Sequence, residues 1–286
     1  TQAGRRVPLT DRALLSLADP VADQLLPEAP ERAPVPPLAA AAIALAKLGR
    51  LLPALVAAPV PEGYADGHAL LSVNAADVLA YPASAATSLK RVASAHVPLE
   101  DAKDVRLVAF RSPDGGIEHM AFLIGPVEQV VQDGGAPLAR IHSECFTGDL
   151  LGSLRCDCGP QLKGAIRKMA EDGAGVLLYL AQEGRGIGLV NKLRAYTLQD
   201  QGLDTLDANR ALGYGADERG FLVAATMLRE LGVPRVRLLT NNPDKLEGLA
   251  ACGIGVMTRE VHKFAGNGVN DRYLQTKADR FGHMLG

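Results

Sequence analysis

Three of the four cysteines in this chain lie close together in the sequence, at Cys145, Cys156 and Cys158. Thiolates are soft ligands that suit zinc, so cysteines gathered in this way predict a metal site. A cluster of cysteines that binds no metal is the alternative. The chain has to fold so that these three side chains meet, and this requirement constrains it more than any other feature of the sequence.

The number of protein ligands separates a structural zinc site from a catalytic one. Structural sites use four protein ligands, whereas catalytic sites use three and keep the fourth position for water, whose pKa falls to about 7. The fourth cysteine, Cys252, lies at an apolar helix end and is expected to be a small buried hydrophobic side chain. We therefore expect an open, catalytic site, with a closed site completed by His142 as the alternative.

Composition excludes some classes of protein. The chain has 286 residues, of which 48% are hydrophobic and 22% are charged, as in soluble globular proteins with one large or two modest domains. Its net charge of −2 gives no basic surface for a nucleic-acid polymer. A nucleotide ligand would therefore need a local binding site.

The most apolar stretch, residues 37–61, is interrupted by Lys47, Gly49, Arg50 and Pro53. A membrane-spanning helix needs about 20 apolar residues, so we expect a buried helix here and no membrane partner. No export signal is recognisable at the start of the chain. The clustered thiols then favour a cytoplasmic protein whose cysteines are ligands and not disulfides.

Strand and helix patterns alternate from residue 105 onward, which predicts an α/β architecture. Apolar runs predict strands over 105–110, 119–124, 138–142, 176–181, 236–239 and 255–261, with helices beginning near residues 160, 189, 221 and 243. We expect residues 96–286 to form the catalytic domain.

The front of the chain, residues 1–95, is expected to form a smaller accessory domain that is either α/β or mostly helical. The pattern predicts a strand over 69–73, a helix over 75–81, and a second helix over 84–93 with Ser84 as its cap. A further short helix is predicted over 11–17. Titratable residues are few here, so packing or support of a dimer is the expected role.

Three segments have patterns typical of anion sites. Glu183–Gly188 lies between a predicted strand and helix, where backbone N–H groups and Arg185 suit phosphate oxygens, although a tight turn explains its glycines equally well. Residues 241–245 begin another helix and fit either an anion site or a plain helix cap. Asp217 and Arg219 are expected at a helix start, where an acidic side chain offsets the dipole and an arginine suits phosphoryl chemistry.

Six motifs, in the same order, resemble those of the GTP cyclohydrolase II family over about residues 100–286. They are Arg140–Asp149, Ser153–Gly159, Gln182–Arg185, Asn191–Gly202, Gly215–Arg219 and Leu238–Pro243. The resemblance implies a mixed sheet with flanking helices and a zinc-dependent hydrolysis that removes C8 of GTP as formate. It also implies release of pyrophosphate and a diaminopyrimidinone ribosylamino phosphate product, in the first step of riboflavin biosynthesis.

The resemblance gives each matching residue a role. The three clustered cysteines would bind one zinc ion per subunit. Tyr196 would assist the hydrolytic step, Asp217 would accept a proton, and Arg219 would attack the α-phosphorus. The implied GTP contacts are Arg140, Ile141, His142, Ser143, Glu144, Gln161, Glu183, Gly184, Arg185, Thr205, Thr240 and Lys245. The family further implies Mg²⁺ bound with the triphosphate, and a homodimer.

The chain departs from the family pattern at three places, one of which is the hairpin region around residues 98–109, where the match is only loose. Gly186 stands where a larger residue such as asparagine is expected, and residues 1–95 lack the acidic motifs of the dihydroxybutanone phosphate synthase domain found in many relatives. We therefore do not expect that second activity. Two alternatives stay open: a paralogue that acts on another nucleotide or stops at the formamide intermediate, and a zinc-stabilised module that only senses a nucleotide.

Overall fold

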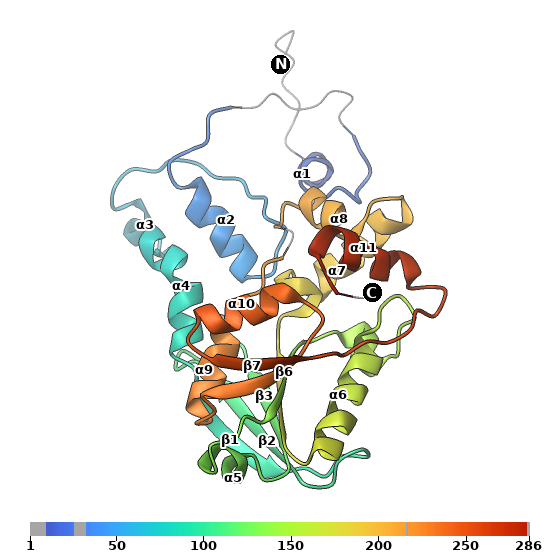
Figure 1. Ribbon diagram of the computed structural model, residues 1–286. Coiled ribbons are helices and arrows are strands. Elements are labelled where there is room, and N and C mark those ends of the chain that lie inside the picture. Colours follow the sequence, from blue (N-terminus) through green and yellow to red (C-terminus); the bar gives the residue numbers. More distant parts are fainter. Residues whose placement is uncertain (1–9, 26–32, 216, 285–286) are drawn as a thin grey trace. The chain divides into compact units, whose positions relative to one another are not determined.

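The structure is a computed structural model that describes residues 10–25, 33–215 and 217–284 (Figure 1). The chain forms two compact units, the first from residues 1–82 and 187–217 and the second from residues 83–186 and 218–286. Residues 187–217, which the sequence assigns to the catalytic domain, thus belong with the N-terminal segment by their contacts. As a division into functional domains, the boundary after residue 95 stays a prediction.

The second unit is built on a mixed sheet that has seven strands within the described residues, in the order β1-β2-β3-β5-β4-β6-β7. The strands are β1 (Lys90–His96), β2 (Val105–Arg111), β3 (His119–Ile124), β4 (Leu138–Ser143), β5 (Gly175–Leu180), β6 (Arg235–Leu239) and β7 (Gly255–Glu260). Neighbours from β1 to β5 along this order pair antiparallel, and neighbours from β5 to β7 pair parallel. The predicted α/β architecture with a mixed sheet is confirmed.

Helices cover both faces of this sheet (Figure 1). Successive side chains of a strand point to opposite faces, and in β5 Leu178 packs in the core that contains α9, whereas Leu177 packs in the core that contains α6. The helices of this unit are α5 (Val127–Gln132), α6 (Cys158–Asp172), α9 (Leu222–Glu230), α10 (Pro243–Ala251) and α11 (Asp271–Phe281). Two apolar cores therefore hold β5 in place from both sides.

Local sequence signals explain where several of these helices begin and end. The side chain of Asn242 accepts a hydrogen bond from the backbone N–H of Asp244, at 3.0 Å, as predicted for the cap of α10. Helix α6 ends at Gly173, whose φ of 96° is the left-handed conformation that glycine adopts most easily. A β-carbon on Gly125 would lie 2.2 Å from the carbonyl oxygen of Gly173, so this second glycine is required by close packing.

The regular secondary structure in the described part of the first unit is helical, and irregular segments such as residues 51–61 connect the helices. Its elements are α1 (Asp11–Ala18), α2 (Ala39–Leu48), α3 (Tyr64–Gly67), α7 (Leu189–Asp200) and α8 (Thr205–Ala211), and α4 (Ala75–Thr87) crosses from this unit into the second. A small core of Ile187, Ala195, Leu198, Ala208, Leu212 and Tyr214 holds it together. Up to residue 95 the described elements are helices and most of strand β1, and the grouping of these residues into one domain stays a prediction.

The predicted elements between residues 69 and 93 are partly wrong. Residues 70–74 are irregular, because the described part of the first unit offers no strand with which they could pair. Ser84 does not cap a new helix but lies inside α4, and the segment after Thr87 becomes β1. Pairing with β2, in which Arg91 lies opposite Phe110, overrides the local helix pattern.

The apolar stretch over residues 37–61 also differs from the expected buried helix. Helix α2 ends at Leu48, one residue before Gly49, and the chain beyond Pro53 is irregular. Several of its apolar side chains are exposed, with Leu51 at 63%. Within the ranges that the structure describes, no helix combines the length and the apolar character needed to cross a membrane.

The double-sided packing of β5 gives a stability prediction. Leu178 has an exposed fraction of 0%, so Leu178→Ala should lower the free energy of unfolding by about 2–5 kcal/mol. Val92→Ala on the exposed strand β1 is the matched control and should change it by less than about 0.5 kcal/mol. Urea unfolding followed by circular dichroism measures both, and equal effects of the two substitutions would contradict the packing described.

Candidate metal and nucleotide site

The three clustered cysteines meet in the second unit. Cys145 follows β4 and precedes a single π-helical turn, η1 (Phe146–Leu150), whereas Cys156 and Cys158 lie at the start of α6. The sulfur atoms of Cys145 and Cys156 are 3.8 Å apart, and all three sulfur atoms lie within 4.8 Å of one another. Thiolates bound at about 2.3 Å to a tetrahedral zinc ion are separated by about 3.8 Å, so this geometry fits the metal.

The turn η1 lies directly against the sulfur atoms, and this contact requires glycine at two positions. A β-carbon on Gly148 would lie 2.7 Å from the sulfur of Cys156 and 3.0 Å from that of Cys145. A β-carbon on Gly159 would lie 2.4 Å from the carbonyl oxygen of Gly148. The backbone of η1 therefore forms one wall of the metal site.

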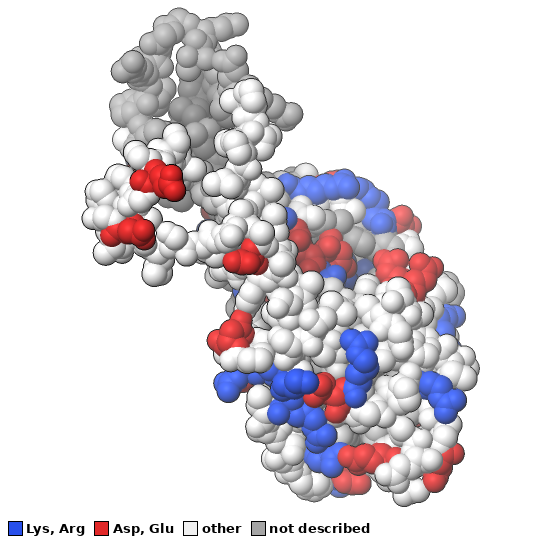
Figure 2. All heavy atoms as spheres, turned by 90° about the vertical axis from the view of Figure 1, so that its left-hand side faces the viewer, with Lys and Arg blue, Asp and Glu red and all other residues white. Residues whose placement is uncertain are grey.

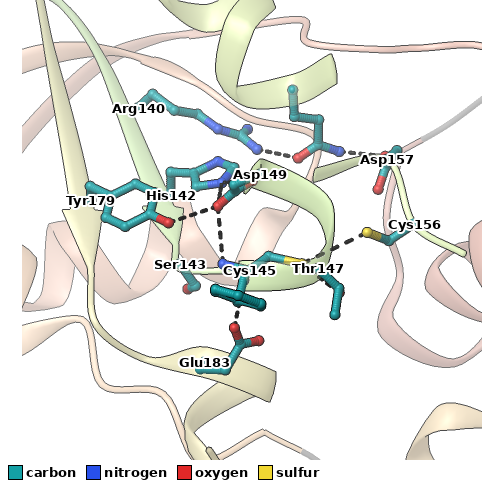
Figure 3. Close-up of polar contacts among 12 residues, drawn as sticks. Arg140, His142, Ser143, Cys145, Thr147, Asp149, Cys156, Asp157, Tyr179 and Glu183 are labelled. Carbon is teal, nitrogen blue, oxygen red and sulfur yellow. Dashed lines mark hydrogen bonds and ion pairs between the residues drawn. The ribbon is translucent and has the colours of Figure 1, made fainter. Parts of the chain in front are cut away.

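His142 does not belong to the ligand set. Among the residues that the structure describes, the group that could hold a metal contains only the three cysteines. Nε2 of His142 instead contacts the carboxylate of Asp149 at 3.1 Å, and its ring stacks on Tyr179 (Figure 3). Burial lowers the pKa of His142, although Asp149 opposes that shift. Cys252 packs partly against the main core, as expected.

Asp149 fixes the turn that carries Cys145. Besides His142, its carboxylate accepts hydrogen bonds from the backbone N–H of Cys145 at 3.0 Å and from the hydroxyl of Tyr179 at 2.9 Å (Figure 3). Burial and the adjacent negative charge of Asp149 raise the pKa of Tyr179, so its hydroxyl stays protonated and donates. Asp149 thus orients the first cysteine ligand through its backbone.

Arg140 lies in β4, five residues before the first cysteine, and is buried. Its guanidinium donates to the carbonyl oxygen of Leu239 at 3.0 Å. It also donates to the side chain of Gln161, which in turn donates to Asp157, and Figure 3 shows this link between Arg140 and Asp157. Burial lowers the pKa of Arg140 to about 10, so it remains charged at neutral pH. The predicted nucleotide residues Arg140 and Gln161 therefore tie β4 and β6 to the cysteine segment.

The glycine loop after β5 also contacts this site. The carboxylate of Glu183 accepts from the backbone N–H of Phe146 at 2.6 Å, which links the loop to η1. Arg185 has a φ of 64°, an uncommon conformation for a residue with a side chain. Gly186 has a φ of 95°, and a β-carbon there would lie 3.1 Å from that of Glu218. This crowding accounts for glycine where a larger residue was expected.

Two other predicted phosphate residues lie at the carboxyl end of β6. Nζ of Lys245 donates to the carbonyl oxygen of Ile141 at 2.8 Å, and the hydroxyl of Thr240 accepts from the backbone N–H of Asn242 at 3.0 Å. Arg219 contacts the hydroxyl of Ser143 at 3.5 Å. Both Asp217 and Arg219 lie in an irregular segment, and α9 begins only at Leu222. The prediction that Asp217 offsets a helix dipole is therefore wrong.

The structure thus gathers most of the predicted site in one unit. The second unit contains Arg140, Ile141, His142, Ser143, Glu144, Cys145, Cys156, Cys158, Gln161, Glu183, Gly184, Arg185, Arg219, Thr240 and Lys245. Tyr196, Thr205 and Asp217 belong to the first unit, and their participation at the cysteine cluster stays a prediction. The sequence analysis gave no role to Gly148, Asp149 or Tyr179. Gly148 and Asp149 lie within the motif Arg140–Asp149, and Tyr179 lies in no motif.

Comparison with known proteins connects this geometry to a family. The model of the family described as GTP cyclohydrolase II matches residues 90–261, which include all three cysteines. The chain belongs to the GTP cyclohydrolase II family. A GTP cyclohydrolase-2 of Azospirillum brasilense is 56% identical over 252 residues, which are 86% of this chain and 64% of that protein. The chain therefore spans less than two thirds of the length of that relative.

Shorter relatives match a smaller share of the chain. The GTP cyclohydrolase-2 of Actinobacillus succinogenes is 52% identical over 197 residues, 69% of this chain and 88% of that protein. The one from an Enterobacter species is 51% identical over 198 residues, 69% of this chain and 98% of that protein. The family match over residues 90–261 covers most of the sheet-containing unit, together with residues 187–217 of the first unit.

The cysteine geometry predicts which thiols bind metal. Cys156→Ala should abolish stoichiometric zinc binding, because it removes one of three ligands, whereas Cys252→Ala should leave it unchanged. Elemental analysis of the purified variants measures zinc per subunit. Retention of a full equivalent of zinc by Cys156→Ala would contradict the site.

The close contact of η1 gives a second prediction. Gly148→Ala should weaken zinc binding although it alters no ligand, because the added methyl group would press on two sulfur atoms. Gly220→Ala is the matched control, since a β-carbon there has open space around it and φ is not in the left-handed region. Competition with a chromogenic chelator measures the two zinc dissociation constants, and identical values would exclude the steric role of Gly148.

Proposed function

We propose that this protein is a zinc-dependent GTP cyclohydrolase II that opens the imidazole ring of GTP. The products would be formate, pyrophosphate and a diaminopyrimidinone ribosylamino phosphate, which enters riboflavin biosynthesis. The observation that carries this proposal is the cluster of three thiols, whose sulfur atoms lie within 4.8 Å of one another, in a chain of this family. Because the three sulfur atoms must stay reduced, we also propose that the protein works in the cytoplasm.

In this proposal the metal activates water, and the residues around it position the site and bind the triphosphate. Three thiolates would hold a zinc ion, which would supply activation of water near neutral pH. Asp149 and Glu183 hold the turn after Cys145, from its two sides. Arg185 and Arg219 would meet the triphosphate together with Mg²⁺, since permanently charged guanidinium groups suit phosphate oxygens.

Tyr196, Asp217 and Arg219 would carry the later steps. In this proposal Tyr196 assists hydrolysis, Asp217 accepts a proton, and Arg219 acts at the α-phosphorus to release pyrophosphate. The contact between Arg219 and Ser143, which is two residues before the first cysteine, supports a position of this arginine close to the metal site. Thr205, Thr240 and Lys245 are proposed as further GTP contacts.

The first unit would support a homodimer. Several of its apolar side chains are exposed in the single chain, among them Val35, Leu38, Leu51, Val56, Leu70, Leu71 and Val73. Soluble monomers rarely expose large apolar patches, and such patches commonly mark an interface with another protein chain.

On the face shown in Figure 2, basic and acidic side chains are interspersed, which fits a small-molecule substrate and not a nucleic-acid polymer.

The activity is tested by incubating the zinc-loaded protein with GTP and Mg²⁺ and measuring both small products. Formate and pyrophosphate in equal amounts are expected. Pyrophosphate without formate, or a formamide product, would indicate a paralogue with altered chemistry. Binding of GTP without either product would indicate a module that only senses the nucleotide.

The proposed role of Arg219 gives a residue-level prediction. Arg219→Ala should lower the rate of pyrophosphate release by roughly 10³-fold, the scale on which arginines act in phosphoryl chemistry, while zinc content stays at one per subunit. Arg259→Ala on the exposed part of β7 is the control and should keep full activity. An unchanged rate for Arg219→Ala would remove this residue from the mechanism.

A further inference from the structure

A buried ion pair joins the C-terminal helix to the metal-binding segment. Nζ of Lys277, on α11, lies 2.6 Å from the carboxylate of Asp157, and the side chains are only 9% and 5% exposed. Asp157 is the single residue between the ligands Cys156 and Cys158. The ion pair therefore holds the backbone between two cysteine ligands, whose positions depend on the conformation of this turn.

The side chain of Asp157 contacts α11 and does not cap α6, although its position before that helix suggests a cap. Asp157 precedes α6, where an aspartate commonly caps the helix, yet it makes no capping hydrogen bond. Its carboxylate instead accepts from Lys277 and from Gln161. The short turn Cys156–Cys158 is thus held by side-chain contacts from two different helices.

These contacts continue into a connected network. Gln161 also accepts from Arg140, and Arg140 donates to the carbonyl oxygen of Leu239 at the end of β6. Lys277 is fixed in turn by Tyr273, whose ring centroid lies 4.4 Å from Nζ. The network runs from α11 through the cysteine turn to two strands of the sheet. Movement of α11 would therefore be transmitted to the metal ligands.

A second contact shows that this part of the chain lies along the cysteine segment. The side-chain amide of Asn267, in the loop before α11, donates to the carbonyl oxygen of Leu154 at 3.1 Å. Residues 262–286, which include this loop and α11, lie beyond the residues matched by the family model.

Charge explains why a lysine is suited to this position. Three thiolates and one divalent ion carry a net charge of −1, and a buried Asp157 adds a second negative charge beside them. A buried carboxylate without a partner is strongly unfavourable, whereas a partner with good geometry offsets most of that penalty. Lys277 supplies the positive charge, and Gln161 supplies the remaining hydrogen bond.

We propose that Lys277 is a positioning residue for the metal site, which fixes the turn between Cys156 and Cys158 through Asp157 and thereby sets the affinity for zinc. This inference rests on the proposed function, because it assumes that the three cysteines bind zinc. It extends the site to a helix that begins more than a hundred residues after the last cysteine ligand in the sequence. Lys277 acts through Asp157 and need not touch the substrate.

The test uses four full-length proteins: the unaltered chain, Lys277→Met, the double variant Asp157→Asn with Lys277→Met, and Lys163→Met as the control. Methionine keeps most of the length of the lysine side chain and removes its charge, and Lys163 is an exposed lysine of α6. Two quantities are measured for each: the zinc dissociation constant, by competition with a chelator, and the unfolding midpoint of the metal-free protein.

Lys277→Met should raise the zinc dissociation constant roughly 10–100-fold, as loss of outer partners of metal ligands does in other proteins, whereas Lys163→Met should not change it. Lys277→Met should also lower the unfolding midpoint, because it leaves the buried charge of Asp157 without its cationic partner. The double variant should return to the midpoint of the unaltered protein, since that buried charge is removed as well. It should still bind zinc weakly, since the link to α11 is absent.

Two results would overturn the proposal. One is a zinc dissociation constant for Lys277→Met equal to that of the unaltered protein. The other is recovery of both zinc affinity and unfolding midpoint in the double variant, because the lysine would then only stabilise the fold. Absence of zinc binding by the unaltered protein would overturn the proposed function, and this inference with it.

Discussion

The approach of three sulfur atoms to one point is the constraint on which the second unit depends. Cys145 arrives from the end of β4, and Cys156 and Cys158 arrive from the start of α6, so strand and helix must be fixed relative to each other at that point. Gly148 leaves room for the turn between them, and Asp149 holds its first residue by the backbone. Zinc binding would replace the protons of these thiols, so the contacts that bring the three side chains together would also define the metal site.

Residues that the family resemblance assigns to the nucleotide also build this frame. The side chains of Arg140, His142 and Lys245 are buried, and each is bonded to another part of the protein, to Leu239, Asp149 and Ile141 respectively. Their contact with GTP stays a prediction, but their present bonds connect β4, β6 and η1 directly. A substitution at any of these positions would therefore change the shape of the site as well as its affinity for a ligand, and activity alone would not separate the two effects.

The sequence allowed prediction of those features whose causes are local. The cysteine spacing, the cap at Asn242 and the apolar runs of the central strands all carry their signal within a few residues. The failures have causes elsewhere in the chain. Residues after Thr87 form β1 because β2 offers a partner, and Asp157 meets Lys277 across 120 residues of sequence. Contacts of that kind leave no periodicity or spacing to read, so π-helical η1 and helix α11 were not anticipated either.

The first unit is assembled from two separated stretches of chain, and this has a consequence for how the protein folds during synthesis. Asn191 donates to the carbonyl oxygen of Arg50, and Arg194 pairs with Asp19, so the early helices gain their partners only when residues 187–217 exist. At a ribosomal rate of roughly 5–20 residues per second, the intervening hundred or so residues take about 5–20 seconds to make. During that interval the apolar side chains of the N-terminal stretch lack these partners and are open to chaperones and to misassociation.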